Sequence, residues 1–184
     1  MARTKGSAFV ALKSFVTRRF GYEGWKRYLS RIEPGERKEI EMPSAKEWYD
    51  LDVWIRSLHV LKDVFGEEVP EVVFAFGRHE AKSDINFGQR LFLRLANPAF
   101  VIEKAGEYWR KFCDFGRWEV ERKGDKAAMA SLLDVPVTDV LYCDELSGYL
   151  KHLFELVGAK NVRLEHTHCR SRGDDKCVWN GSWD

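Results

Sequence analysis

Residues 161–179 read NVRLEHTHCRSRGDDKCVW, and this stretch decides the fold. Apolar and polar residues alternate from Asn161 to His168, which is the period of a half-buried strand. Residues 172–175 (RGDD) have the composition of a tight turn, and the chain returns from Cys177 with the same alternation. The stretch therefore predicts an antiparallel hairpin at the end of the chain.

Outward from this hairpin, the pattern changes to helices. A helix is predicted from a cap at Thr138 or Asp139 to Gly158, and another hairpin from Trp118 to Leu133. Apolar spacings of three and four residues predict further helices over residues 6–20, 25–32, 48–65, 70–77, 91–95 and 100–112, with residues 33–46 as a connecting loop. This order predicts an α+β fold with helices packed on a small antiparallel sheet, in a single domain over residues 1–184.

Composition limits the class of protein. The chain has 184 residues, 45% of them hydrophobic, which is enough for a packed core. No apolar run approaches the roughly 18 to 20 residues of a membrane span, and the first residues lack an export signal, so we expect a cytoplasmic protein without a membrane span. Residues 1–38 carry a net charge of +7 within a chain of net charge +1. We interpret the helical N-terminal segment, residues 1–40, as a solvated basic face, with a contact surface for an acidic partner as the alternative. We expect no nucleic acid as partner.

Four residues form the sharpest chemical pattern in the sequence: Cys143, His166, Cys169 and Cys177. Thiolate and imidazole are donors that zinc prefers, and three cysteines with one histidine make a closed tetrahedral site of the structural kind. The sequence predicts a structural zinc that joins helix and hairpin in a C-terminal lobe, residues 140–184. Two alternatives stay open, namely thiols without metal and a disulfide between Cys169 and Cys177.

The fourth ligand is the least defined member of this set. Strand alternation places His166 and His168 on one face and Glu165 on the other with Cys169, so the donor depends on where the strand bends. We take His166 as the ligand, with His168 and Glu165 as the alternatives. The remaining cysteine, Cys113, has the surroundings of a core thiol.

The spacing of these residues, together with the turn at Gly173, resembles the C-terminal signature of the 4-vinyl reductase family of domains. In the aromatic-sensing bacterial transcription activators that carry this domain, the corresponding positions bind zinc through three cysteines and one glutamate. Cys143, Cys169 and Cys177 match the three thiols, and His166 stands where the family has its glutamate.

The start of the chain resembles a related group. Lys5-Gly6, the helix after it, and Phe20-Gly21 before Trp25 look like the opening of haem nitric-oxide-binding domains. These share a superfamily with the 4-vinyl reductase domains and with subunits of TRAPP transport complexes. Haem binding in that group needs a proximal histidine on a central helix and a Tyr-x-Ser-x-Arg motif. The sequence has neither, so we do not expect a haem gas sensor.

These observations predict a zinc-held module that binds or senses an apolar or aromatic small molecule and signals through a protein partner or a dimer rearrangement. An excess of aromatic residues indicates an enclosed cavity between helices and sheet. The candidate cavity-lining residues are Trp54, Phe76, Phe100, Trp109, Trp118 and Leu133. Each of them is equally compatible with an ordinary core position.

The alternative prediction is a protein-interaction or scaffold module of the TRAPP type, with a structural zinc and no ligand. In either case we expect a homodimer formed through the helical N-terminal half, and a protein partner whose identity the sequence does not give. We do not expect an enzyme, because the chain has no dinucleotide fingerprint and no nucleophile elbow. Zinc with four protein ligands also leaves no open coordination position.

Overall fold

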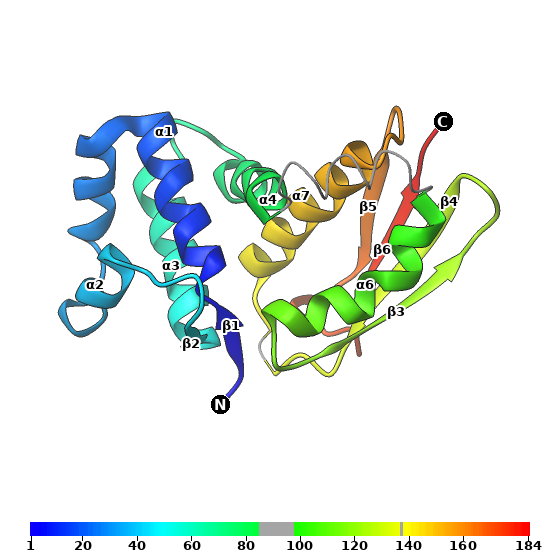
Figure 1. Ribbon diagram of the computed structural model, residues 1–184, viewed down its shortest axis with the longest axis horizontal. Coiled ribbons are helices and arrows are strands. Elements are labelled where there is room, and N and C mark those ends of the chain that lie inside the picture. Colours follow the sequence, from blue (N-terminus) through cyan, green and yellow to red (C-terminus); the bar gives the residue numbers. More distant parts are fainter. Residues whose placement is uncertain (85–97, 137) are drawn as a thin grey trace.

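The computed structural model describes residues 1–84, 98–136 and 138–184, except the side chains of residues 98–103 and 105. Helices lie at both ends of the molecule and a four-stranded sheet lies at one end (Figure 1). The first half contains β1 (Arg3–Lys5), α1 (Ser7–Leu29), α2 (Pro34–Glu41), β2 (Trp48–Asp50), α3 (Leu51–Phe65) and α4 (Val72–Asp84). The second half contains α6 (Pro98–Phe112), β3 (Arg117–Arg122), β4 (Ala127–Leu133), α7 (Val140–Leu156), β5 (Arg163–His168), a short 3₁₀ helix η1 (Arg170–Arg172) and β6 (Cys177–Ser182).

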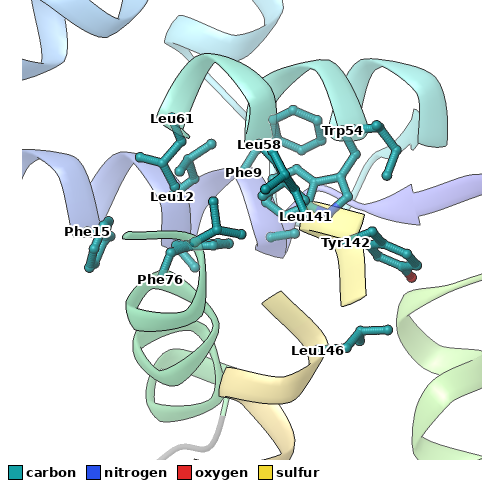
Figure 2. Close-up of a cluster of buried hydrophobic side chains, with 14 of the residues drawn as sticks. Phe9, Leu12, Phe15, Trp54, Leu58, Leu61, Phe76, Leu141, Tyr142 and Leu146 are labelled. Carbon is teal, nitrogen blue, oxygen red and sulfur yellow. The ribbon is translucent and has the colours of Figure 1, made fainter. Parts of the chain in front are cut away.

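The main core forms where α1, α3, α4 and α7 meet (Figure 2). Apolar residues at helical spacing in α1 and α3 point to one side, so Phe9 of α1 packs edge-on against Trp54 of α3. The ring centroids of Phe76 of α4 and Trp54 lie 5.7 Å apart, and the side chains of Phe9, Trp54 and Phe76 are all buried. The apolar faces that the sequence gives to α1 and α3 are thus buried against α4 and α7.

The two predicted hairpins join into one antiparallel sheet with the strand order β3-β4-β6-β5. Leu132 of β4 pairs with Cys177 of β6, and His166 of β5 pairs with Trp179 of β6. Directly paired residues lie on the same face of a sheet, so these side chains share the face toward the helices. The sheet therefore brings the end of β5 and the start of β6 close to the beginning of α7.

Helices α4 and α7 cross more closely than side chains normally allow. A Cβ atom added to Gly77 would lie 2.0 Å from the carbonyl oxygen of Glu145, and one added to Gly148 would lie 2.0 Å from that of Phe74. Only glycine permits this approach of the two backbones. The crossing fixes α7, which carries residues of both sites described below.

The structure confirms the α+β class and the single domain, and differs from the predictions in detail. Residues 34–41 form helix α2 rather than a loop, because Pro34 opens the helix at its first turn. The two first helices merge into α1, with a kink at Gly21, where φ is 71°. The predicted helix over residues 91–95 lies outside the described residues. In the described part of the chain, no helix is long and apolar enough to span a membrane.

Candidate metal centre

Cys143 lies in the first turn of α7, where a cap fixes its position. The Asp139 side chain accepts hydrogen bonds from the backbone N–H groups of Leu141 (2.8 Å) and Tyr142 (3.2 Å). This is the N-cap arrangement that satisfies the free N–H groups of a helix start. The thiol of Cys143 thus lies at the buried, positive end of the helix.

The other two thiols come from the connection between β5 and β6. Cys169 precedes η1, and Gly173 ends that 3₁₀ turn with φ of 97°, a backbone conformation that suits glycine. The Asp174 carboxylate accepts a hydrogen bond of 2.6 Å from the Cys169 backbone N–H, which closes the turn. Cys177 then begins β6. The local turn therefore brings two cysteines eight positions apart in the sequence to one place.

Four ligand atoms converge here, as the sequence predicts. One donor atom from each of Cys143, His166, Cys169 and Cys177 lies within 4.8 Å of the others. The Sγ atom of Cys143 is 3.6 Å from that of Cys177 and 3.7 Å from that of Cys169. The three thiols are buried and not joined by a disulfide. Three sulfurs and one imidazole nitrogen at such distances form a donor set for a single metal ion.

The electrostatics favour a thiolate within this cluster. A hydrogen bond from the Cys143 thiol, the nearby imidazole of His166 and the backbone N–H of Arg170 together lower the pKa of Cys177 to about 4, against the opposing effect of burial. The Arg170 N–H lies 3.5 Å from the Cys177 sulfur. The hydrogen bond to Cys177 and burial both raise the pKa of Cys143. These contacts thus favour the thiolate form of Cys177 over that of Cys143, and metals bind the thiolate form.

A β-bulge decides the fourth donor. His166 pairs with Trp179 and His168 with Val178, so two steps along β5 match one step along β6. The bulge separates the two histidines that strict alternation places on one face, and it leaves His168 exposed, as is Glu165. Among the three alternatives, only His166 belongs to the cluster.

Outer contacts hold the imidazole of His166. Its ring stacks on Trp179 with centroids 4.4 Å apart, and its buried Nε2 has no hydrogen-bond partner among the described residues. Trp179 donates a hydrogen bond of 2.8 Å to the Ser147 hydroxyl, which donates to the Cys143 carbonyl. Sequence spacing did not indicate the roles of Asp174, Trp179 and Ser147, because each acts through a contact made only in the folded chain.

The predicted cavity-lining residues do not converge. Trp54 and Phe76 pack in the core of the N-terminal helices, whereas Trp109 and Trp118 contact each other between α6 and β3, with ring centroids 5.8 Å apart. Leu133 pairs with Arg117, on the sheet face opposite to Trp118. The side chain of Phe100 lies outside the described residues.

A shallow groove of about 360 Å³ lies elsewhere, at the end of the sheet. Its lining includes Lys123, Arg163 and Ser182 and none of the predicted residues. The groove and the predicted cavity-lining residues therefore do not coincide.

Comparison with known proteins shows the relatives of the fold. No family model matches the sequence, and none of the curated proteins does. Among solved structures, an H-NOX protein from S. oneidensis in the Fe(II) ligation state, mutated at three positions, has a TM-score of 0.76 and 16% identity, with 98% of this chain and 96% of that chain covered. The Fe(II) unliganded H-NOX protein from K. algicida has a TM-score of 0.70 and 14% identity over 98% and 96% of the chains. The IWP-051-bound H-NOX from Shewanella woodyi, in the Fe(II)CO state, has a TM-score of 0.69 and 17% identity, with 97% of this chain and 94% of that chain covered.

These structures correct several predictions. They are H-NOX proteins in Fe(II), Fe(II)NO and Fe(II)CO states. This finding overturns both the prediction of structural zinc as the cofactor and the expectation that a haem gas sensor is excluded. The proposed zinc-held module, and the TRAPP-type scaffold as its alternative, are overturned by the same finding. Assignment to the 4-vinyl reductase family is not supported, whereas the likeness in fold to haem nitric-oxide-binding (H-NOX) structures is. At 14–17% identity, the likeness shows that this chain has the H-NOX fold.

Proposed function

We propose that this chain is a sensor domain on the H-NOX fold, and that Cys143, His166, Cys169 and Cys177 bind one metal ion in it. The observation that carries the metal site is the convergence of four donor atoms within 4.8 Å. Support for a sensing role comes from the solved structures, which are H-NOX proteins in Fe(II), NO-bound and CO-bound states.

The donor set supports binding rather than catalysis. Four protein donors fill a tetrahedral shell and leave no coordination position for a substrate. The unpartnered Nε2 of His166 also supports a bound ion, because a buried polar atom without a partner is costly unless something else satisfies it. We therefore propose that metal occupancy, and not turnover, is what this site contributes.

Helix α7 is the element through which occupancy would reach the rest of the molecule. Cys143 lies in its first turn, and its Gly148 lies against the backbone of α4. The side chain of Glu145, also on α7, accepts a hydrogen bond of 3.2 Å from the Trp54 indole of α3. A change in the metal site would thus bear on α7, and through it on α3 and α4.

Haem, the group that the fold implies, finds no axial donor on helix α6. Helix α6 has no histidine, cysteine or methionine from Pro98 to Phe112. The space between α6 and the sheet is occupied by Trp109, Trp118 and Trp179, whose neighbouring rings lie 5.8 and 5.4 Å apart. These residues do not fit an iron porphyrin, so no step of the proposal passes through haem.

Elemental analysis of the purified, reduced protein tests the metal site. We expect one metal ion per chain, with the measurement also identifying the ion, and less than about a tenth of that in Cys169→Ser, because three donors hold an ion far more weakly than four. His166→Ala is expected to lose the ion as well.

Two matched variants serve as controls. His168→Ala removes an imidazole two positions along the same strand, and Cys113→Ser removes the one cysteine outside the cluster; both are expected to keep the ion. Metal-free wild-type protein, or equal loss from His166→Ala and His168→Ala, would show that these four residues are not the site.

The predicted homodimer and protein partner remain predictions. The described surface offers a few large apolar side chains at its exposed positions, including Val10, Tyr22 and Val140. Size measurement in solution with and without bound metal would show whether occupancy changes the assembly.

A further inference from the structure

A second cluster of polar groups lies in the interior, where α4 crosses α7. Glu80 and Asp84 are four residues apart on α4, and Glu145 and Tyr149 are four residues apart on α7. Residues at this spacing lie on one face of a helix, so each helix presents two of them along the crossing. Glu80 and Glu145 are 6% and 4% exposed, values that carboxyl groups rarely reach in a folded protein.

Hydrogen bonds account for most of this cluster. The Trp54 indole donates to Glu145 Oε2 at 3.2 Å, and the Tyr149 hydroxyl donates to Asp84 Oδ2 at 3.2 Å. Glu80 and Glu145 share a hydrogen bond with each other. One oxygen of Glu80, Oε2, is buried and accepts no hydrogen bond from a described residue. A buried acceptor without a donor is unfavourable, so this atom indicates a group that completes the site.

The one arginine of α4 makes its ion pair outside the cluster. Arg78, on α4, directs its guanidinium to Glu155 at 2.8 Å instead. Burial raises the pKa of Asp84 to about 6 and that of Glu80 well above its usual range, the latter with the added repulsion of Glu145. Without a cation, the acids must therefore hold protons to remain buried.

We propose that Glu80 and Glu145 bind a hard cation of the Ca²⁺, Mg²⁺ or Mn²⁺ class between α4 and α7, with Asp84 and Tyr149 supporting them from the next turn. Carboxylate oxygens from facing helices are a common construction of metal sites in helical cores. Such cations take oxygen ligands, and Mg²⁺ uses as few as one or two carboxylates together with water. The cation would replace the proton that the two glutamates share and would satisfy Glu80 Oε2.

This site is separate from the thiol cluster in chemistry. The cluster of Cys143 and its partners offers sulfur and nitrogen, which hard cations do not prefer. The second site offers only oxygen. The proposal goes beyond the proposed function and does not depend on it.

Terbium luminescence provides the test, since Tb³⁺ is an oxygen-seeking cation whose emission is sensitised by nearby aromatic rings. Trp54 and Tyr149 each contact a carboxyl of the site. We expect saturable emission from the wild-type protein that Ca²⁺ displaces. Glu80→Gln is expected to weaken Tb³⁺ binding about 100-fold, and Tyr149→Phe about tenfold, as loss of a supporting contact does.

Four further measurements make the outcome unambiguous. Glu67→Gln, at an exposed position, is the control for nonspecific surface binding and is expected to leave the affinity unchanged. Cys169→Ser is expected to retain the Tb³⁺ signal even if it abolishes the metal of the thiol cluster. Circular dichroism checks that Glu80→Gln folds, and Glu145→Gln repeats the test on the other helix.

The proposal would be overturned by three results. The first is wild-type emission no greater than that of Tb³⁺ with unfolded protein. The second is a Tb³⁺ affinity in folded Glu80→Gln and Glu145→Gln equal to that of the wild type. The third is loss of the signal in Cys169→Ser. The last result would place the emission at the thiol cluster, whereas failure of the thiol cluster itself would appear only in the elemental analysis.

Discussion

Helix α7 carries two donor sets that differ in almost every property. Cys143 faces the sheet and joins two thiols and an imidazole, whereas Glu145, two residues later, faces α4 and joins carboxyl groups. Two residues of an α-helix are about 200° apart around its axis, so the two side chains point to opposite sides. One helix thereby separates a soft donor set from a hard one, and the fold keeps each away from the other.

The two regions also differ in how the chain assembles them. The thiol cluster draws on a short hairpin and the start of the helix before it, positions within 35 residues of each other, from 143 to 177. The carboxyl cluster joins Glu80 to Glu145, residues on helices separated by α6 and a hairpin. The first region is held by local turns, and the second depends on the crossing of α4 and α7. A substitution at that crossing should therefore disturb the carboxyl cluster more than the thiol cluster.

The strongest such perturbation is Gly148→Ala. The new Cβ would lie 2.0 Å from the carbonyl oxygen of Phe74, a backbone atom that cannot move aside by itself. We expect a loss of about 3 kcal/mol in the free energy of unfolding, the upper part of the usual range for overpacking. Urea unfolding measures it, and Gly35→Ala, where a Cβ meets nothing within 4 Å, is the control. Unchanged stability in Gly148→Ala would show that the helices are not packed this closely.

The dependence of stability on pH provides the next test of the carboxyl region. Burial raises the pKa of Asp84 from 3.8 to about 6, against a hydrogen bond from Tyr149 that lowers it. Because the folded pKa lies above the unfolded one, this group's stabilisation is complete below pH 4 and is lost as the pH rises through 6. The loss is about 3 kcal/mol at most.

Asp84→Asn should remove this part of the pH dependence, because an amide oxygen still accepts from Tyr149 but does not ionise. Urea unfolding at pH 4 and pH 7.5 gives the comparison, with Asp63→Asn at an exposed position as control. An increase of wild-type stability with pH that Asp84→Asn abolishes would mean that the hydrogen bond outweighs burial, and would reverse the sign of this argument.

The sequence was sufficient to predict the thiol cluster and insufficient for the carboxyl cluster. Cys169 and Cys177 flank a turn with recognisable composition, so local rules already place them together. Strict alternation failed only at the bulge between His166 and His168, which no local rule predicts. The two hairpins and most of the helices followed from periodicity for the same reason, whereas helix α2 was predicted as a loop.

Contacts between residues far apart in the chain could not be predicted from the sequence. Nothing in the spacing indicates that Glu80 meets Glu145, since this depends on two glycines at one helix crossing. Likewise, seven tryptophans suggested one cavity, but Trp54 packs against Phe9 whereas Trp109 packs against Trp118, within one extended hydrophobic cluster. Aromatic content predicts burial well, whereas it does not predict which buried residues become neighbours.

The smallest expected effect concerns the start of α7 and sharpens the difference between the two regions. Asp139 caps the helix with one oxygen, and its other oxygen lies 2.7 Å from Nε2 of His59, whose side chain is half-exposed. Asp139→Ala removes both contacts and is expected to cost about 1 kcal/mol, the usual value of an N-cap. Asp139→Asn keeps the cap and should cost only about 0.3 kcal/mol, because exposed ion pairs contribute little. Urea unfolding separates the two, with Thr138→Ala as the neighbouring control.

The same pair of variants distinguishes the regions by metal affinity. Cys143 lies one turn after the cap, and its backbone N–H donates to the Asp139 carbonyl at 3.4 Å. Fraying of this turn in Asp139→Ala should weaken metal binding at the thiol cluster about tenfold in chelator competition, an effect typical of lost outer contacts. Tb³⁺ affinity should stay unchanged, since Glu145 and Tyr149 lie beyond the first turn and are held by α4. If Asp139→Asn weakened the thiol cluster as much as Asp139→Ala, then the contact with His59, and not the cap, would be what holds Cys143 in place.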